Sequence, residues 1–363
     1  MDNFMNISVC IIVKNEEKHI ENCLKPLSKL GCEIVVVDTG STDDTKTLAK
    51  KYTDRIYDFQ WSDDFSKARN YAVSKAENDF IFVIDADEYI IKFEKEKILQ
   101  FFEKNPEKIG RLKLIDQIKM PSGEKTTSTF YVSRFFNRKK FRFEGAIHEQ
   151  IVSAEDTNTK FQTKNLDAFA THHGYDLSEE EKIKKAKRNI EILKKELERQ
   201  RGDSKETVNI PYTLHQLGKS YYFMADYKNA KKYFLEALDY DLDSDLEYVV
   251  DMICSLGYTL IYLEEYKEAL LLESVYDAFS TSADFLFLMG LIYMNNAKFA
   301  DAITEFKKAV QITESAVDGV NSYRAFYNIA VIYEVAGDIK NAKVYYKKAG
   351  DYLPAKNRLA ELK

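Results

Sequence analysis

Short apolar runs alternate with helical stretches over the first 175 residues. The apolar runs are rich in β-branched and aromatic residues and read almost continuously apolar, which is typical of strands buried on both faces. Buried strands separated by helices indicate a mostly parallel sheet, so we predict an α/β domain whose ligands bind at the carboxyl ends of the strands. The expected strands are Ile7–Val13, Glu33–Val37 and Phe80–Ile84, and the expected helices cover 14–30, 42–52 and 65–76.

A different pattern, an internal repeat, begins near residue 207. Small, aromatic and alanine positions recur at fixed offsets in three copies: Leu217-Gly218, Tyr221, Ala230, Phe234 and Ala237; Met289-Gly290, Tyr293, Ala302, Phe306 and Ala309; and Ile329-Ala330, Tyr333, Ala342, Tyr346 and Ala349. A weaker copy around Gly257 carries Glu273 where an aromatic residue is expected. This spacing resembles the tetratricopeptide repeat, which implies an all-α solenoid of about four helix-turn-helix units with an extended concave binding face.

Between the two patterns, residues 179–201 predict one long amphipathic helix. Its apolar positions follow spacings of 3, 4, 3 and 4 and form a narrow seam (Ile183, Ala186, Ile190, Leu193 and Leu197). We expect a connector that packs on a neighbouring domain; a homodimer through this helix or the repeats stays open. The predicted organisation is an α/β domain at 1–177, a connecting helix at 178–203 and a repeat domain at 204–363.

Composition and charge narrow the class of protein. A net charge of −6 and a pI near 5.6 argue against a protein that binds nucleic acid over its whole surface. The four cysteines form no CxxC pair, which is typical of reduced thiols in a cytosolic protein. No apolar stretch is long enough to span a bilayer, and the N-terminus lacks the pattern of a signal peptide. The sequence therefore predicts a cytoplasmic protein without a membrane span.

The most informative polar residues follow the predicted strands. Asp38 ends the second apolar run, and Asp85-Ala86-Asp87 follows the third. Two carboxylates two residues apart can face one divalent cation, and oxygen ligands suit Mg²⁺ or Mn²⁺, which can then hold a diphosphate. A DxD sequence alone is weak evidence, but its place at a strand end beside Asp38 strengthens it. These residues by themselves support a metal-assisted α/β enzyme.

Four stretches in order carry a family resemblance. They are Ser8–Glu17, Ile34–Thr45, Trp61–Asn70 and Phe82–Glu88. Together they resemble a family 2 glycosyltransferase with the nucleotide-sugar-binding GT-A fold, and with the repeats they resemble the bacterial subgroup that glycosylates proteins and peptides. The resemblance implies a UDP-sugar donor, a divalent metal (Mn²⁺ or Mg²⁺), an inverting transfer, and a protein or peptide acceptor recruited by the repeats.

The resemblance also assigns residues on the donor side. It places the loop after the first strand near the base and ribose (Lys14, Asn15 and Glu16) and gives Asp38 a hydrogen bond to the base. Arg69 would neutralise phosphate charge, and its structural alternative is an ion pair with Asp63 or Asp64.

The same resemblance assigns the metal ligands. Asp85 would contact the ribose, the sugar or the metal, and Asp87 the metal, while Glu88 receives no role beyond that of a solvated carboxylate. His172 is the expected third protein ligand, from a His-His-Gly-Tyr segment that ends at Tyr175, and His173 is its alternative.

An inverting transfer needs a carboxylate that takes the acceptor proton. Glu149 is the expected base and Glu144 the second choice; the structural alternative is that His148 and Glu149 pair and hold a loop. The basic run 134–142 suggests either an RNA contact or, as we prefer in an acidic chain, a loop that faces the acceptor or phosphate.

Three functions compete on the sequence. The preferred one is a metal-dependent glycosyltransferase that acts on a protein or peptide, with a glycan or lipid acceptor as the variant. The second is a non-catalytic repeat scaffold with a decayed sugar-nucleotide domain, which the intact motifs disfavour. The third is a nucleotidylyltransferase, which would carry a Gly-rich basic loop after the first strand where this chain has Val13–Glu17.

Overall fold

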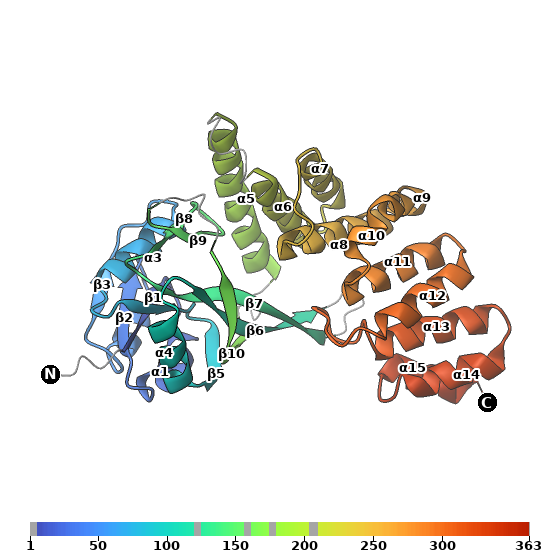
Figure 1. The fold of residues 1–363 in the computed structure, drawn as a ribbon, viewed down its shortest axis with the longest axis horizontal. Coiled ribbons are helices and arrows are strands. Elements are labelled where there is room, and N and C mark those ends of the chain that lie inside the picture. Colours follow the sequence, from blue (N-terminus) through green and yellow to red (C-terminus); the bar gives the residue numbers. More distant parts are fainter. Residues whose placement is uncertain (1–5, 120–124, 156–160, 174–178, 203–209, 363) are drawn as a thin grey trace. The chain divides into compact units, whose positions relative to one another are not determined.

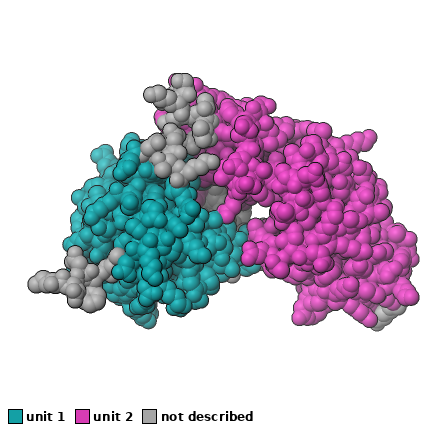
Figure 2. All heavy atoms as spheres, viewed as in Figure 1, with its two compact units in different colours: residues 1–182 teal, residues 183–363 magenta. Residues whose placement is uncertain are grey.

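A computed structural model describes residues 6–119, 125–155, 161–173, 179–202 and 210–362. The chain divides into two compact units, Met1–Lys182 and Ile183–Lys363 (Figure 2). The predicted boundaries at 177/178 and 203/204 lie outside the described residues and stay predictions. Within the described residues, no helix is both long and apolar enough to cross a membrane.

The first unit is built on an eight-stranded sheet in the order β3-β2-β1-β4-β7-β6-β10-β5 (Figure 1). Strands β3, β2, β1 and β4 are parallel to one another, as are β6 and β10, so the predicted α/β fold with a mostly parallel sheet is confirmed. The antiparallel contacts are those of β7 with β4 and β6 and of β10 with β5. The strands are β1 Ile7–Val13, β2 Glu33–Asp38, β3 Ile56–Asp58, β4 Phe80–Val83, β5 Glu88–Phe93, β6 Ile109–Lys119, β7 Lys125–Asn137 and β10 Thr163–His172, and β8 Phe141–Glu144 pairs with β9 Gln150–Ser153 in a separate hairpin.

Apolar clusters lie on both faces of this sheet because successive strand side chains point to opposite sides. On one face the strands pack with α1, α2 and α4, and on the other with α3 and the β8–β9 hairpin. Neighbouring residues of β2 show the alternation, since Val36 belongs to the first cluster and Val35 to the second. The helices are α1 Ile20–Ser28, α2 Thr45–Ala49, α3 Phe65–Ser74 and α4 Lys95–Lys104.

The first two helices are shorter than predicted. The helix expected over 14–30 begins only at Ile20, and Asn15 has a φ of 56°. A residue in the left-handed region cannot lie inside a right-handed helix, so this segment forms a loop after β1. The helix expected over 42–52 is reduced to α2, because the residues before it are held by side-chain contacts with the loop after β1.

The second unit is helical. α6 packs on α7, α11 on α12 and α13 on α14, as the repeat predicts, while α8 is followed by a short α9 and a 3₁₀ helix. The helices are α5 Glu179–Gly202, α6 Ile210–Phe223, α7 Tyr227–Ala237, α8 Glu247–Tyr262, α9 Tyr266–Ala269, η2 Leu270–Val275, α10 Tyr276–Phe279, α11 Ala283–Asn295, α12 Phe299–Ala309, α13 Tyr323–Val335, α14 Ile339–Lys348 and α15 Leu353–Glu361.

From Ile183 onward, the long helix α5 belongs to the second unit. The predicted seam is buried at Ile190, Leu193 and Leu197 but exposed at Ile183. Lys194 lies over the ring of Tyr221 on α6, at 5.7 Å from its centroid. The C-terminal half of the seam therefore packs on the first repeat helices, and the N-terminal turns do not contribute to that core.

Small residues in the repeats lie directly against aromatic rings. A Cβ atom on Gly218 would come within 2.4 Å of the Phe234 ring, and one on Gly290 within 2.5 Å of the Phe306 ring. In the weaker copy, Leu272 and Leu288 fill the space above Gly257, which explains how that unit tolerates Glu273 in place of an aromatic residue. The sequence spacing thus corresponds to a real contact between paired helices.

This contact predicts the effect of a single methyl group. Gly290→Ala is expected to destabilise the second unit by about 1–3 kcal/mol, because the fully buried Phe306 ring must move to admit the new Cβ. Gly202→Ala is the matched control, since a Cβ there meets nothing within 4 Å. Urea unfolding, monitored by circular dichroism, gives the free energy of unfolding of both variants. Equal stability of the two variants would contradict the packing argument.

Candidate active site

Two loops at the carboxyl ends of β1 and β2 are joined by hydrogen bonds. The Asn15 N–H donates to Ser41 Oγ at 2.9 Å, and Asn15 Oδ1 accepts from the Thr42 N–H at 2.8 Å. The Glu16 N–H donates to Thr45 Oγ1 at 2.7 Å. Of the three residues assigned to the nucleoside, Lys14 and Asn15 are exposed and Glu16 is half-buried. The predicted nucleotide loop therefore has a fixed backbone and two exposed side chains.

Asp38 lies at the end of β2 and is only 2% exposed. Its Oδ1 accepts hydrogen bonds from the N–H groups of Gly40 at 2.9 Å and Ser41 at 2.8 Å. Its Oδ2 is buried and has no hydrogen-bond partner among the described residues. One oxygen of Asp38 thus holds the turn after β2, while the other is a buried acceptor that no described group satisfies.

Asp85 is held from both sides by arginines. Arg69 Nη2 donates to Asp85 Oδ1 at 2.8 Å, and Arg134 Nη2 donates to Asp85 Oδ2 at 2.9 Å. Although burial alone would raise it, the two guanidinium groups hold the pKa of Asp85 well below its usual range. Arg69 does not pair with Asp63 or Asp64, since Asp63 accepts from the Trp61 indole and Asp64 caps α3.

Glu88 is the clearest departure from the sequence prediction. It is 2% exposed rather than solvated, because β5 begins there and pairs with β10. Its carboxylate is bonded to Arg134 and accepts the Asp85 N–H at 3.1 Å. Burial raises the pKa of Glu88 to about 7 against the opposing charge of Arg134, with a further contribution from the negative charge of Asp85.

Asp87 faces His172 across the end of the sheet. His172 Nε2 lies 3.3 Å from Asp87 Oδ2, and His172 Nδ1 lies 2.8 Å from Asp116 Oδ1. Burial lowers the pKa of His172, but the hydrogen bonds with Asp116 and Asp87 outweigh it and raise the pKa to about 10. Asp116 thus fixes the ring so that Nε2 points at Asp87.

His173 is engaged differently from its neighbour. Its ring stacks on Tyr89 with centroids 4.2 Å apart, and its Nε2 lies 3.1 Å from Thr171 Oγ1. Its backbone N–H donates to the Asp87 carbonyl at 2.8 Å. Of the two histidines, His172 is the one whose ring nitrogen faces the second carboxylate of the DxD motif. Gly174 and Tyr175 lie outside the described residues.

The donor set fits a divalent metal without completing its shell. Among the described residues, no group of three or more His, Cys, Asp or Glu side chains is arranged to hold a metal ion. Asp87 and His172 nevertheless present an oxygen and a nitrogen to each other, and Asp116 orients the histidine as outer partners of metal-bound histidines do. Magnesium-type sites often use one or two carboxylates and complete the shell with substrate phosphates.

Glu149 comes to the site on the β8–β9 hairpin. Asn70 on α3 binds both backbone groups of Phe143, at 2.8 and 2.9 Å, and the Phe65 N–H donates to Ala146 O at 2.7 Å. With the hairpin docked in this way, Glu149 bonds to Arg69 Nε. The same guanidinium therefore holds both Glu149 and Asp85.

Glu144 contacts a different arginine, Arg142. Its carboxylate is 3.2 Å from Arg142 Nη2 and its side chain is 35% exposed. Of the other basic residues in the run 134–142, Arg138 donates to the carbonyls of Val73, Ala76 and Glu77 at the end of α3, and Lys139 pairs with Asp79. The run is thus divided between the site and structural contacts and is not one continuous binding loop.

Sequence reasoning missed Asp116, and it placed Arg134 only in a basic run, not beside Asp85. Asp116 lies in the middle of β6, where no motif marks it, and it reaches His172 because the two residues are paired in the β6–β10 register. Arg134 precedes Phe135, which pairs with Phe82, so it lies beside the carboxyl end of β4. Both placements depend on strand pairing between distant segments.

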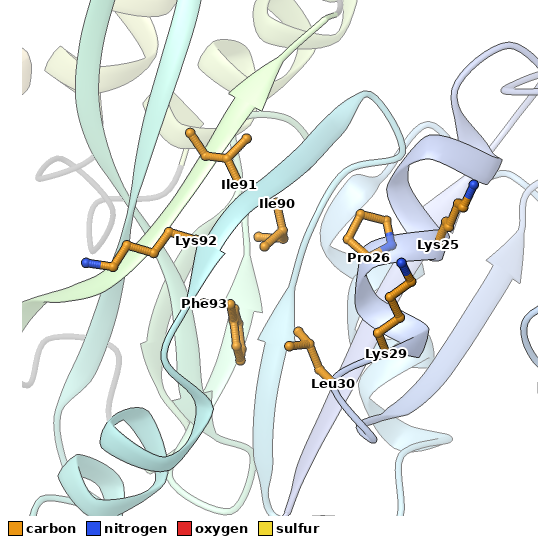
Figure 3. Close-up of a pocket in the computed structure, with 8 residues that line it drawn as sticks. All are labelled: Lys25, Pro26, Lys29, Leu30, Ile90, Ile91, Lys92 and Phe93. Carbon is orange, nitrogen blue, oxygen red and sulfur yellow. The ribbon is translucent and has the colours of Figure 1, made fainter.

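A pocket elsewhere in the first unit lies between the C-terminal half of α1 and β5 (Figure 3). Its lining residues are apolar or lysine: Lys25, Pro26, Lys29, Leu30, Ile90, Ile91, Lys92 and Phe93. None of these side chains is a carboxylate or a histidine, so the pocket presents none of the side chains that usually bind a divalent metal.

Three parts of the chain match models of known families or domains. Residues 8–154 match the family model described as glycosyl transferase family 2. This part of the chain is a family 2 glycosyltransferase domain. Residues 211–244 match the tetratricopeptide repeat, and residues 290–362 match a domain of unknown function, DUF6340. The resemblance seen in the sequence is confirmed in both parts, and glycosyltransferase is confirmed as the enzyme class of the domain.

Two relatives found by sequence are named for different parts of such a chain, one as a glycosyltransferase and one as a TPR repeat-containing protein. The glycosyltransferase SunS of Bacillus subtilis is 31% identical over 252 residues, which cover 64% of this chain and 57% of SunS. The chain thus spans just over half the length of that relative. A TPR repeat-containing protein of Synechococcus elongatus is 34% identical over 146 residues, 40% of this chain and 35% of that protein. A crystal structure of MamA is 23% identical, covers 51% of this chain and 98% of its own, and has a TM-score of 0.37; at that score the likeness adds no argument.

Proposed function

We propose that this chain is a metal-dependent, inverting glycosyltransferase that moves a sugar from a UDP-sugar to a protein or peptide side chain. The observation that carries the proposal is the cluster at the carboxyl edge of the sheet, where Asp38, Asp85 and Asp87 lie at strand ends and His172 faces Asp87. A family 2 domain over 8–154 supports the reaction class.

The nucleotide takes the β1 and β2 side of this edge. Asp38 accepts a hydrogen bond from the base through Oδ2, which lacks a partner among the described residues, after a small shift of the atoms that bury it. The exposed side chains of Lys14 and Asn15, with Glu16 behind them, line the base and ribose. Asp85 accepts from ribose or sugar hydroxyls, since each carboxylate oxygen keeps a second acceptor direction beside its arginine.

Asp87 and His172 would hold the divalent ion, Mn²⁺ or Mg²⁺, with Asp85, two residues before Asp87, as a further candidate ligand. When bound, the ion neutralises negative charge on the diphosphate of the donor. Asp116 keeps His172 turned toward Asp87. Arg69 holds Asp85 and Glu149 in place, and its Nη1, buried without a partner among the described residues, is a donor left for phosphate.

Glu149 acts as the base that accepts the proton of the acceptor nucleophile. It shares the Arg69 guanidinium with Asp85, so the base lies next to the donor-side carboxylate. Glu144, whose carboxylate lies beside Arg142, is the second choice. The repeats recruit the acceptor or a second copy of the chain, and we place the reaction in the cytoplasm.

A screen of UDP-sugars tests the proposal. The chain is expected to release UDP from one donor in the presence of Mn²⁺ or Mg²⁺ and to stop in excess EDTA. Release of pyrophosphate instead would identify a nucleotidylyltransferase. If the chain neither turned over a donor nor bound UDP in calorimetry, the result would favour the non-catalytic repeat scaffold.

A further inference from the structure

We propose that Arg134 and Glu88 are positioning residues that fix the carboxylate of Asp85 in the orientation that donor and metal require. This inference rests on the proposed function, because it assigns Asp85 to the donor site. Neither Arg134 nor Glu88 belongs to the residues given a role above. What connects them is a continuous set of ion pairs: Glu149, Arg69, Asp85, Arg134 and Glu88 alternate in charge.

The backbone and side chain of Asp85 are held at four atoms. Its N–H donates to Glu88 Oε2 at 3.1 Å, and its carbonyl accepts from the Glu88 N–H at 3.1 Å. Its Oδ1 and Oδ2 accept from Arg69 and Arg134. Glu88 thus holds the main chain, and Arg134 ties the carboxylate to Glu88 through one nitrogen, Nη2. The aspartate has no free rotation left.

The exposure of the five side chains indicates which of these charged groups can meet a ligand. The Asp85 side chain is 34% exposed, whereas those of Arg69, Arg134, Glu88 and Glu149 are 7%, 13%, 2% and 10% exposed. Burying four charged groups costs free energy that an ion pair on the surface would avoid. The arrangement is understandable when the buried groups serve to present the one exposed carboxylate in a fixed geometry, as preorganised sites require.

Strand pairing explains why Arg134 supplies this contact. β7 runs antiparallel to β4 with Phe135 opposite Phe82, so Arg134 comes opposite Val83, the last residue of β4, two residues before the DxD motif begins. The neighbouring arginine in the sequence run, Arg138, lies past the other end of the pairing and binds the carbonyls at the end of α3. Two arginines of one segment therefore have separate roles.

Calorimetry of the full chain with Mn²⁺ in the presence of UDP tests the proposal. Arg134→Met is expected to weaken Mn²⁺ binding about 10- to 100-fold, the range found when partners that orient metal ligands are removed. Since Arg134→Met leaves Glu88 buried without its cation, the variant Glu88→Gln/Arg134→Met removes both charges and is expected to fold with the same loss of affinity. Turnover of the donor is measured alongside.

Arg138→Met is the matched control. It removes an arginine with purely structural partners from the same segment, so it is expected to lower the melting temperature while Mn²⁺ affinity stays unchanged. Unchanged affinity in the double variant and in Arg134→Met would overturn the positioning role while leaving the glycosyltransferase proposal intact. Failure of the unaltered chain to bind UDP or Mn²⁺ would refute the proposed function and this inference with it.

Discussion

Asp87→Ala is expected to abolish Mn²⁺-dependent binding of UDP and, with it, glycosyl transfer. The substitution removes the oxygen that faces His172 Nε2, so only the histidine of the proposed ligand pair remains. The fold is expected to survive, because the backbone carbonyl of Asp87 still accepts the His173 N–H and His172 keeps its contact with Asp116. Calorimetry with Mn²⁺ and UDP measures the loss of binding, and a thermal melt shows whether the fold survives.

Asp58→Ala is the control for Asp87→Ala. Asp58 also ends a strand, β3, but its carboxylate is paired with Lys46 and its side chain is 75% exposed. We expect wild-type UDP binding and turnover from this variant. Full activity of Asp87→Ala, or full activity of the unaltered chain in excess EDTA, would contradict the assignment of the DxD motif to a metal.

Local patterns predicted the elements of this chain well. β1 has the predicted bounds, Ile7–Val13, and β2 and β4 differ from the prediction by one residue. These strands are buried on both faces, so nearly every inner position is apolar and the signal needs no knowledge of the partner strand. The repeats were equally predictable, because Gly218 and Phe234 meet within one helix pair only 16 residues apart in sequence.

The contacts at the site that could not be predicted are those that depend on pairing between strands far apart in sequence. Asp116, Arg134 and Glu88 receive their neighbours from the register of β6, β7 and β5 in the sheet, and sequence spacing does not determine register between distant strands. Glu88 illustrates the consequence. Read locally, it extends an acidic run that belongs in solvent, but pairing with His172 on β10 buries it.

The candidate residues that sequence motifs supplied are brought together in part. Asp85, Arg69 and Glu149 lie in one network, and Asp87 faces His172. The roles of these residues stay predictions until binding and turnover are measured. The motif assigned Arg69 only to phosphate, whereas in the structure its guanidinium pairs with two carboxylates, those of Asp85 and Glu149.

Glu149→Gln is expected to lower turnover about 10²- to 10⁴-fold while UDP affinity stays near that of the unaltered chain. Glutamine keeps the size of the side chain and can still accept a hydrogen bond from Arg69 Nε, so the contact of Arg69 with Asp85 is preserved. What is lost is a group that can take the proton of the acceptor. Steady-state kinetics with the donor found in the screen, and calorimetry with UDP, separate these two effects.

Glu144→Gln distinguishes the two carboxylates of the hairpin. Because Glu144 contacts Arg142 and not Arg69, its loss is expected to leave both turnover and UDP affinity nearly unchanged. A large loss of turnover in Glu144→Gln, with Glu149→Gln still active, would exchange the two roles and leave Glu149 as a partner that only holds Arg69. A parallel loss of UDP affinity in Glu149→Gln would show instead that this carboxylate acts through Arg69 and Asp85 on the donor, because a base that meets only the acceptor has no effect on donor binding.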